Sequence, residues 1–149
     1  MDKSAEVVLA YWNEHRQQLR QSENQRAALT NYILVIVAAL SGFIVQWEFR
    51  LETVALSSLI AVIGLYGAIT VAKYHERAEY HLTQARALTQ ELVSIGALPH
   101  DKSGLDNARN AHYAKYPRLH RLRLHSLWTG LHGGVSIYGV ALFIVAVTL

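Results

Sequence analysis

Three long apolar runs without any Lys, Arg, Asp or Glu dominate this chain of 149 residues, at 29–47, 54–72 and 127–149. At about 1.5 Å of rise per residue, a helix over either of the first two runs is about 29 Å long and a helix over the third about 34 Å, enough to cross a hydrocarbon core. Lipid offers the backbone no hydrogen-bond partner, and the runs are continuous rather than alternating, so we expect helices and not barrel strands. We predict an all-α integral membrane protein with three transmembrane helices.

The Lys and Arg residues are distributed unevenly between these runs. Four precede the first run, Arg50 alone separates the first from the second, and nine lie between the second and the third. Because cationic flanks stay on the cytoplasmic side, we predict that the amino terminus and residues 73–126 are cytoplasmic, and that residues 48–53 and the carboxyl terminus face outward. The nine cations of the longest connection are Lys73, Arg77, Arg86, Lys102, Arg109, Lys115, Arg118, Arg121 and Arg123.

The polar segments predict a small cytoplasmic helical bundle. Residues 1–28 have an amphipathic helical pattern and contain no Pro or Gly, so we expect one helix that continues into the membrane hairpin of residues 29–72. The region 73–126 begins as an extension of the second span, which Gly96 and Pro99 end. A short helix over 105–116 then returns, and Pro117 is the expected first residue of the helix that becomes the third span, 127–149. We expect no removable secretory signal, since no small-residue cleavage site precedes the first run.

Self-association is expected because the cytoplasmic bundle is too small to bury a stable core by itself. Small residues recur at spacings suited to close helix contact, either within one chain or between chains. We predict a homo-oligomer, with a tetramer as the preferred closed ring. The small residues are Ala38 with Gly42, then Ser57, Ala61, Gly64 and Ala68, and Gly130 with Gly134.

The sequence Arg118-Leu-His-Arg-Leu-Arg-Leu-His125 leads directly into the third run. One interpretation is an anchor that touches anionic lipid headgroups. The other is a phosphate-binding surface, because on a helix Arg118, Arg121 and His125 would share one face, to which Arg123 adds charge and which Lys115 and His112 would extend.

The extension of the second span is also rich in charged, histidine and tyrosine side chains, and three interpretations stay open for it. The first is a solvated helix face with alternating charges, and the second is an anion-binding surface with interleaved aromatic rings. The third is a metal or acid–base site made by His75, Glu79 and His81. The candidate ligand-binding residues here are Lys73, His75, Arg77, His81 and Arg86.

A few polar residues within or beside the spans are candidates for a pore or gate. His132 lies inside the third run, where an ionisable side chain faces protein or water; a hydrogen-bonded packing residue is the alternative. Asn31 and Gln46 add polar groups to the first run. In a ring of subunits, Glu48 and Glu52 would repeat around an outer mouth and favour cations.

Several functional classes find no support in this sequence. The chain contains no Cys, which excludes disulfides, thiolate zinc sites and thiol catalysis. Walker, dinucleotide, nucleophile-elbow and metalloprotease motifs are absent, and no inverted repeat suggests a transporter. We expect no enzyme, no metal and no cofactor.

The overall plan resembles a family of small bacterial membrane effectors. The motifs are Glu23-Asn24-Gln25-Arg26-Ala27-Ala28-Leu29-Thr30-Asn31-Tyr32 entering the first span and Lys73-Tyr74-His75-Glu76-Arg77 leaving the second. They are similar to the SLATT-type and Hailong-type effectors of nucleotide-signalling anti-phage defence, although SLATT-type proteins have two spans. The resemblance implies an oligomeric channel in the bacterial inner membrane, controlled by a nucleotide from a partner nucleotidyltransferase, or by a single-stranded DNA oligomer that holds the channel shut. A lipid-binding scaffold without channel activity is the alternative.

Overall fold

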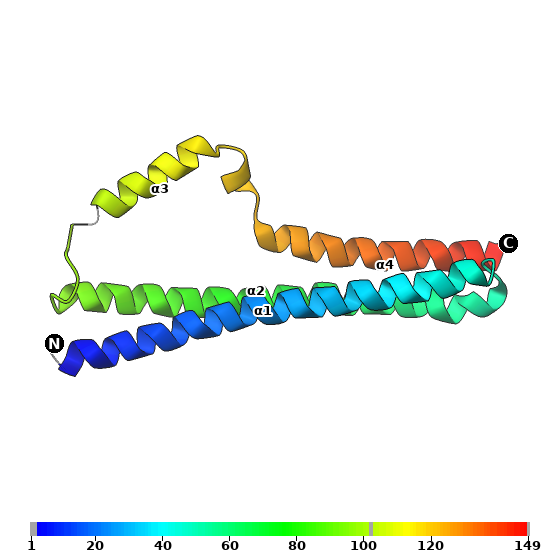
Figure 1. The fold of residues 1–149 in the computed structure, drawn as a ribbon, viewed down its shortest axis with the longest axis horizontal. Helices are drawn as coiled ribbons and strands as arrows, with labels where there is room; N and C mark the ends of the chain where they lie inside the picture. The colour runs from blue at the N-terminus through cyan, green and yellow to red at the C-terminus, as the bar shows by residue number, and fades with distance from the viewer. Residues whose placement is uncertain (1–2, 102, 149) are drawn as a thin grey trace. The chain divides into compact units, whose positions relative to one another are not determined.

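The computed structural model describes residues 3–101 and 103–148, and every regular element in this part of the chain is a helix (Figure 1). Lys102, one of the predicted cytoplasmic cations, lies outside the described residues. The elements are α1 (Lys3–Gln46), the 3-10 turn η1 (Leu51–Thr53), α2 (Val54–Ser94), α3 (Ser103–Lys115), the 3-10 turn η2 (Leu119–Arg121) and α4 (Leu124–Thr148). Helices α1, α2 and α4 are each long and apolar enough to cross a membrane, which confirms the predicted number of candidate spans.

The chain divides into two compact units, which we call the head unit and the span unit. The head unit comprises Met1–Ser22 and Glu76–Arg123, and the span unit comprises Glu23–His75 and Leu124–Leu149. Helices α1 and α2 each run from one unit into the other. They stay continuous because α1 contains no Pro or Gly before residue 42 and α2 contains no Pro.

The span unit packs parts of α1, α2 and α4 around one apolar cluster. Ile33, Val37 and Ile44 come from α1, Ile60 from α2 and Val135 from α4. Hydroxyl groups within these helices donate to the carbonyl oxygen one turn earlier, as from Ser41 to Val37 at 2.7 Å and from Ser57 to Thr53 at 3.0 Å. Such bonds satisfy polar side chains where lipid would offer no partner.

Helices α2 and α4 approach so closely that their backbones touch. A Cβ added at Gly64 would collide with the backbone of Ser136, and one added at Gly139 would collide with the backbone of Ala61. The Ser136 hydroxyl also donates to the Ala61 carbonyl oxygen across this contact, at 2.9 Å. The expectation of close packing through Ala61 and Gly64 is therefore confirmed within one chain.

Other predicted small-residue contacts are not formed within the chain. A Cβ added at Gly42, Gly130 or Gly134 would meet nothing within 4 Å. Gly42, Gly130 and Gly134 therefore make no close helix contact with the described residues of their own chain.

The turn after α1 and the turn after α2 both contain residues in the left-handed backbone conformation. Glu48 and Phe49 have φ of 52° and 58° in the turn after α1, where the half-buried Phe49 packs against the apolar cluster. Gly96 has φ of 74° after α2, and the Gly96 and Ala97 amides donate to the carbonyl oxygens of Val93 and Leu92. These two bonds form a Schellman motif, and they confirm the predicted end of this helix at Gly96.

Candidate functional site

The segment between α3 and α4 differs from its prediction. Pro117 does not begin the helix of the third span; α3 ends at Lys115, a turn and η2 follow, and α4 begins only at Leu124. Arg118, Arg121 and His125 therefore do not share a helix face. Residues 118–125 contain three Arg and two His but no carboxylate, so a helix there would bring like charges together without any compensating ion pair.

Aromatic rings and cations gather at the end of α3 in a different way. The rings of Tyr113 and His120 stack with centroids 5.0 Å apart and an interplanar angle of 23°. His120 Nδ1 lies 3.1 Å from the Tyr116 carbonyl oxygen, which holds η2 against the last turn of α3. The Lys115 ammonium lies 5.5 Å from the centre of the Tyr116 ring. We call this group, formed by His112, Tyr113, Lys115, Tyr116 and His120, the aromatic cluster.

The aromatic cluster and the cations that follow it are solvent-exposed throughout, Arg118, Arg121 and Arg123 included. His112 and Lys115 were expected to extend a helix face of Arg118, Arg121 and His125; the structure instead places both of them against the Tyr116 ring in the aromatic cluster. Tyr113, Tyr116 and His120 were missed by sequence reasoning. Their spacing of three and four residues is a detectable signal, although it becomes meaningful only once the return of the chain after Pro117 is known.

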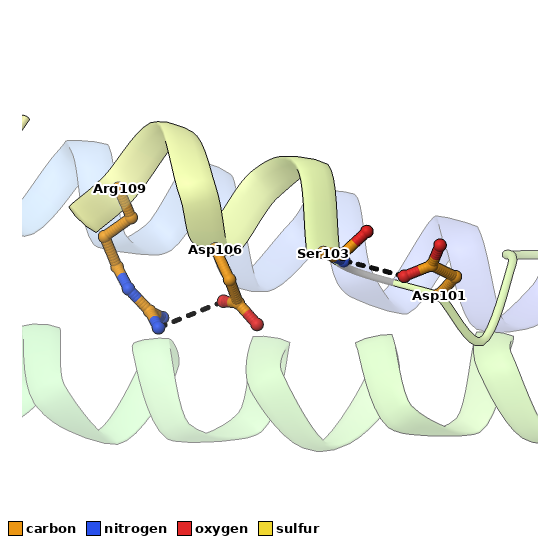
Figure 2. A network of polar contacts seen from close by, with 4 residues as sticks. All are labelled: Asp101, Ser103, Asp106 and Arg109. Carbon is orange, nitrogen blue, oxygen red and sulfur yellow. Dashed lines mark hydrogen bonds and ion pairs between the residues drawn. The ribbon is translucent and has the colours of Figure 1, made fainter. Parts of the chain in front are cut away.

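Helix α3 exposes every described residue along its length. Figure 2 shows the contacts that support its first turns. The Ser103 amide donates to Asp101 Oδ1 at 2.9 Å, and Arg109 Nη2 lies 3.0 Å from Asp106 Oδ1. The backbone bond from Ser103 is the main reason why the pKa of Asp101 lies below its usual range. Exposed local bonds of this kind are worth little individually, and no residue of α3 is buried, so these contacts add little to the stability of this helix.

A second set of predicted residues lies between α1 and α2 in the head unit. His81 Nδ1 lies 3.0 Å from Nδ1 of His15, and the Tyr80 ring meets the His15 ring edge-on. Arg77 Nη2 donates to Gln18 Oε1 at 3.3 Å. Burial is the first cause that lowers the pKa of His81, followed by His15 and Arg77, whereas Glu14 acts in the opposite direction.

Other predicted residues of α2 are dispersed. Arg86 is exposed on α2 in the head unit, and Lys73 is exposed in the span unit. His75 stacks on His125 with centroids 3.9 Å apart and an interplanar angle of 9°. No group of three or more His, Cys, Asp or Glu able to hold a metal occurs in residues 3–101 and 103–148, so His75, Glu79 and His81 do not form the metal site left open above.

The proposed pore residues occupy three different places in the span unit. Gln46, Glu48 and Glu52 line one open recess at the α1–α2 turn, together with Trp47 and Arg50. Asn31 is exposed on α1. His132 is fully buried, and its Nε2 lies 3.0 Å from Thr30 Oγ1. This is the packing arrangement that was the alternative to a gate, and a gating role for any of these residues stays a prediction.

A polar group that sequence reasoning missed surrounds Arg26. The Arg26 guanidinium lies over the Trp128 ring, 5.4 Å from its centre, and the Thr30 hydroxyl one turn further donates to the Arg26 carbonyl oxygen at 3.0 Å. Since that hydroxyl proton is already used, Thr30 accepts its second bond from His132 Nε2–H. His132 Nδ1 is then a lone-pair acceptor, and it faces Gly67 of α2.

Comparison of the chain with protein-family models, with curated proteins and with solved structures gives no significant match.

Proposed function

We propose that this chain is the subunit of a homo-oligomeric ion channel in the bacterial inner membrane, an effector of anti-phage defence whose opening is controlled by an anionic nucleotide or a short single-stranded DNA. The ligand binds the aromatic cluster and the cations at 118–123. The observation that carries the proposal is the exposed stack of Tyr113 on His120, with the exposed cations Lys115, Arg118 and Arg121 within a few residues of it in the chain.

The chemistry of this surface suits a single strand better than a duplex. Exposed rings offer faces on which unpaired bases stack, largely regardless of their sequence. Arg side chains supply planar, bidentate donors for the phosphates between those bases. With only Asp106 as a carboxylate from residue 103 to residue 125, the electrostatic potential of this stretch favours polyanions.

Gating needs a ligand that binds the closed and open assemblies with different affinity, because equal binding shifts no equilibrium. In a ring, each subunit adds one copy of the surface, and a strand that engages several copies gains from their effective concentration. The open glycines Gly42, Gly130 and Gly134 support the formation of a ring, since they leave places for close contact with another helix. A partner nucleotidyltransferase would supply the ligand.

The basic stretch can be tested by replacing Arg118, Arg121 and Arg123 together with Gln. We expect the affinity for a short single-stranded DNA to fall by about tenfold or more. We also expect the slope of log affinity against log salt to fall by up to about 2, since three phosphate contacts are lost. Filter binding at several salt concentrations measures both. The matched control replaces three exposed cations elsewhere, Lys3, Arg20 and Arg50, and unchanged affinity in the Arg118, Arg121 and Arg123 variant would refute the assignment.

A lipid-binding scaffold is the second candidate, and one observation favours it. Leu119, Leu122 and Leu124 alternate with the cations and are 65%, 59% and 60% exposed, a pattern suited to a membrane surface. Vesicles that contain the purified chain separate the two functions. The channel proposal expects an ion flux that the DNA oligomer changes, whereas the scaffold gives no flux with or without it.

A further inference from the structure

Arg26 is a buried charge without a counter-charge. Only 8% of the surface of Arg26 is exposed, and its Nε has no hydrogen-bond partner. Among the described residues no carboxylate lies within ion-pair distance of it. Arginine keeps its positive charge in folded proteins, and an uncompensated buried charge is strongly unfavourable.

The indole of Trp128 is a second unsatisfied donor at the same place. Its ring supports the guanidinium, but its buried Nε1 has no acceptor. A cation–π contact stabilises the charge and supplies no hydrogen-bond acceptor. Arg26 Nε–H and Trp128 Nε1–H can only donate, so the partner of each must be a hydrogen-bond acceptor, and one group with several acceptor oxygens can serve both.

The neighbouring groups do not supply that partner. The Thr30 hydroxyl is occupied by Arg26 O and His132 Nε2, and His132 Nδ1 faces Gly67. Arg26 lies three residues before the apolar run 29–47, and Trp128 is the second residue of the run 127–149, so both lie at the end of a span, where headgroup phosphates are found. This position holds for either orientation of the chain, because both membrane surfaces carry phosphates.

We infer that Arg26 and Trp128 form a binding site for a phosphate group. The planar guanidinium can donate two hydrogen bonds to phosphate oxygens, and the indole can donate one more. The phosphate comes either from a phospholipid headgroup or from free inorganic phosphate. The site is independent of the proposed channel activity and shares no residue with the aromatic cluster or the cations at 118–123.

The test uses the full chain, purified and stripped of lipid in detergent. Phosphatidylglycerol, diacylglycerol with the same acyl chains and inorganic phosphate are titrated separately, and binding is followed by native mass spectrometry and by the melting temperature. We expect phosphatidylglycerol to bind and to raise the melting temperature, and diacylglycerol, which lacks the phosphate, to do neither. Competition by inorganic phosphate would identify the free ion as the ligand, and its absence would identify the lipid diester.

Two variants and one control locate the site. Arg26→Gln removes the charge and should weaken phosphatidylglycerol binding by about tenfold or more. Trp128→Phe keeps a ring beneath the guanidinium and removes only the N–H, so we expect a loss of about threefold. Arg20→Gln removes an exposed cation of the same helix and should bind like the wild type. Should Arg26→Gln fail to fold, Trp128→Phe decides alone. Wild-type affinity in the variants, equal binding of diacylglycerol, or no binding of either phosphate compound by the wild type would overturn the inference.

Discussion

At the scale of single residues, the contact between His15 and His81 makes the packing of α1 against α2 in the head unit depend on pH. The contact between Nδ1 of His15 and Nδ1 of His81, 3.0 Å long, is a hydrogen bond only while one of these two atoms carries a proton and the other does not. With both rings protonated, two positive charges would meet between α1 and α2, beside the further positive charge of Arg77.

We expect acid to loosen this contact. Because the pKa of His81 is lowered in the folded chain, the folded state binds fewer protons there than the unfolded state just below pH 6.5. The stabilising contribution is thus present above about pH 6.5 and is lost as the pH falls through the lower folded value. Hydrogen exchange of residues 3–22, corrected for the intrinsic rate, should accelerate from pH 7.5 to pH 5.5 in the wild type and much less in His81→Gln. His100→Gln, in the exposed turn after α2, is the control; an equal acceleration in His81→Gln would contradict the prediction.

At the scale of elements, the contact between α2 and α4 shows why glycines in one membrane protein are not equivalent. Gly64 and Gly139 meet backbone atoms of the opposite helix, which cannot rotate away as a long side chain can. Gly130 and Gly134 lie on α4 as well, yet face open space. Helical spacing alone does not distinguish Gly139 from Gly130 and Gly134, since all three are small residues on α4.

Substitution of the contact glycines by alanine should therefore separate α2 from α4. We expect Gly64→Ala and Gly139→Ala each to lower the free energy of unfolding by about 1–3 kcal/mol, because the added methyl group overfills a contact already closed. Gly133→Ala is the control, because a Cβ added there would meet nothing within 4 Å. It should be neutral or slightly stabilising, as alanine is the better helix former. Unfolding by SDS in mixed micelles, followed by tryptophan fluorescence, measures the difference. Equal stability of Gly139→Ala and Gly133→Ala would show that the two helices are not in contact at Gly139.

At the scale of the whole molecule, topology is the property on which the functional proposal depends most. The absence of Cys allows single cysteines to report it without background. We expect Glu48→Cys to react with a membrane-impermeant maleimide in intact spheroplasts, and Asn110→Cys to react only after permeabilisation, because the cations lie in 73–126. Both positions are exposed in the folded chain, so access to reagent is equal. The opposite labelling pattern would place the aromatic cluster outside the cell and eliminate an intracellular ligand.

The helices were predictable, and so was close packing through Ala61 and Gly64, whereas the other contacts between helices were not. Continuous apolar runs and the lack of early Pro or Gly determine α1, α2 and α4, and Gly96 marks an end that local backbone chemistry dictates. The proximity of Arg26 to Trp128, or of His15 to His81, depends on the rotation and register of packed helices, which hydropathy does not encode. The error at Pro117 has a local cause: proline tolerates the first turn of a helix but does not create one where like charges follow.

The complete exposure of α3 has a consequence for the affinity of any ligand that binds its helical form. A helix of 13 residues that gains nothing from burial is marginal in water, so a ligand that requires its helical form must also supply the free energy of ordering it. Coupled folding and binding of this kind lowers net affinity without removing contacts. If the proposed ligand binds the helical form of α3, part of its binding free energy is spent on ordering this helix, and its net affinity is lower than for a preformed helix.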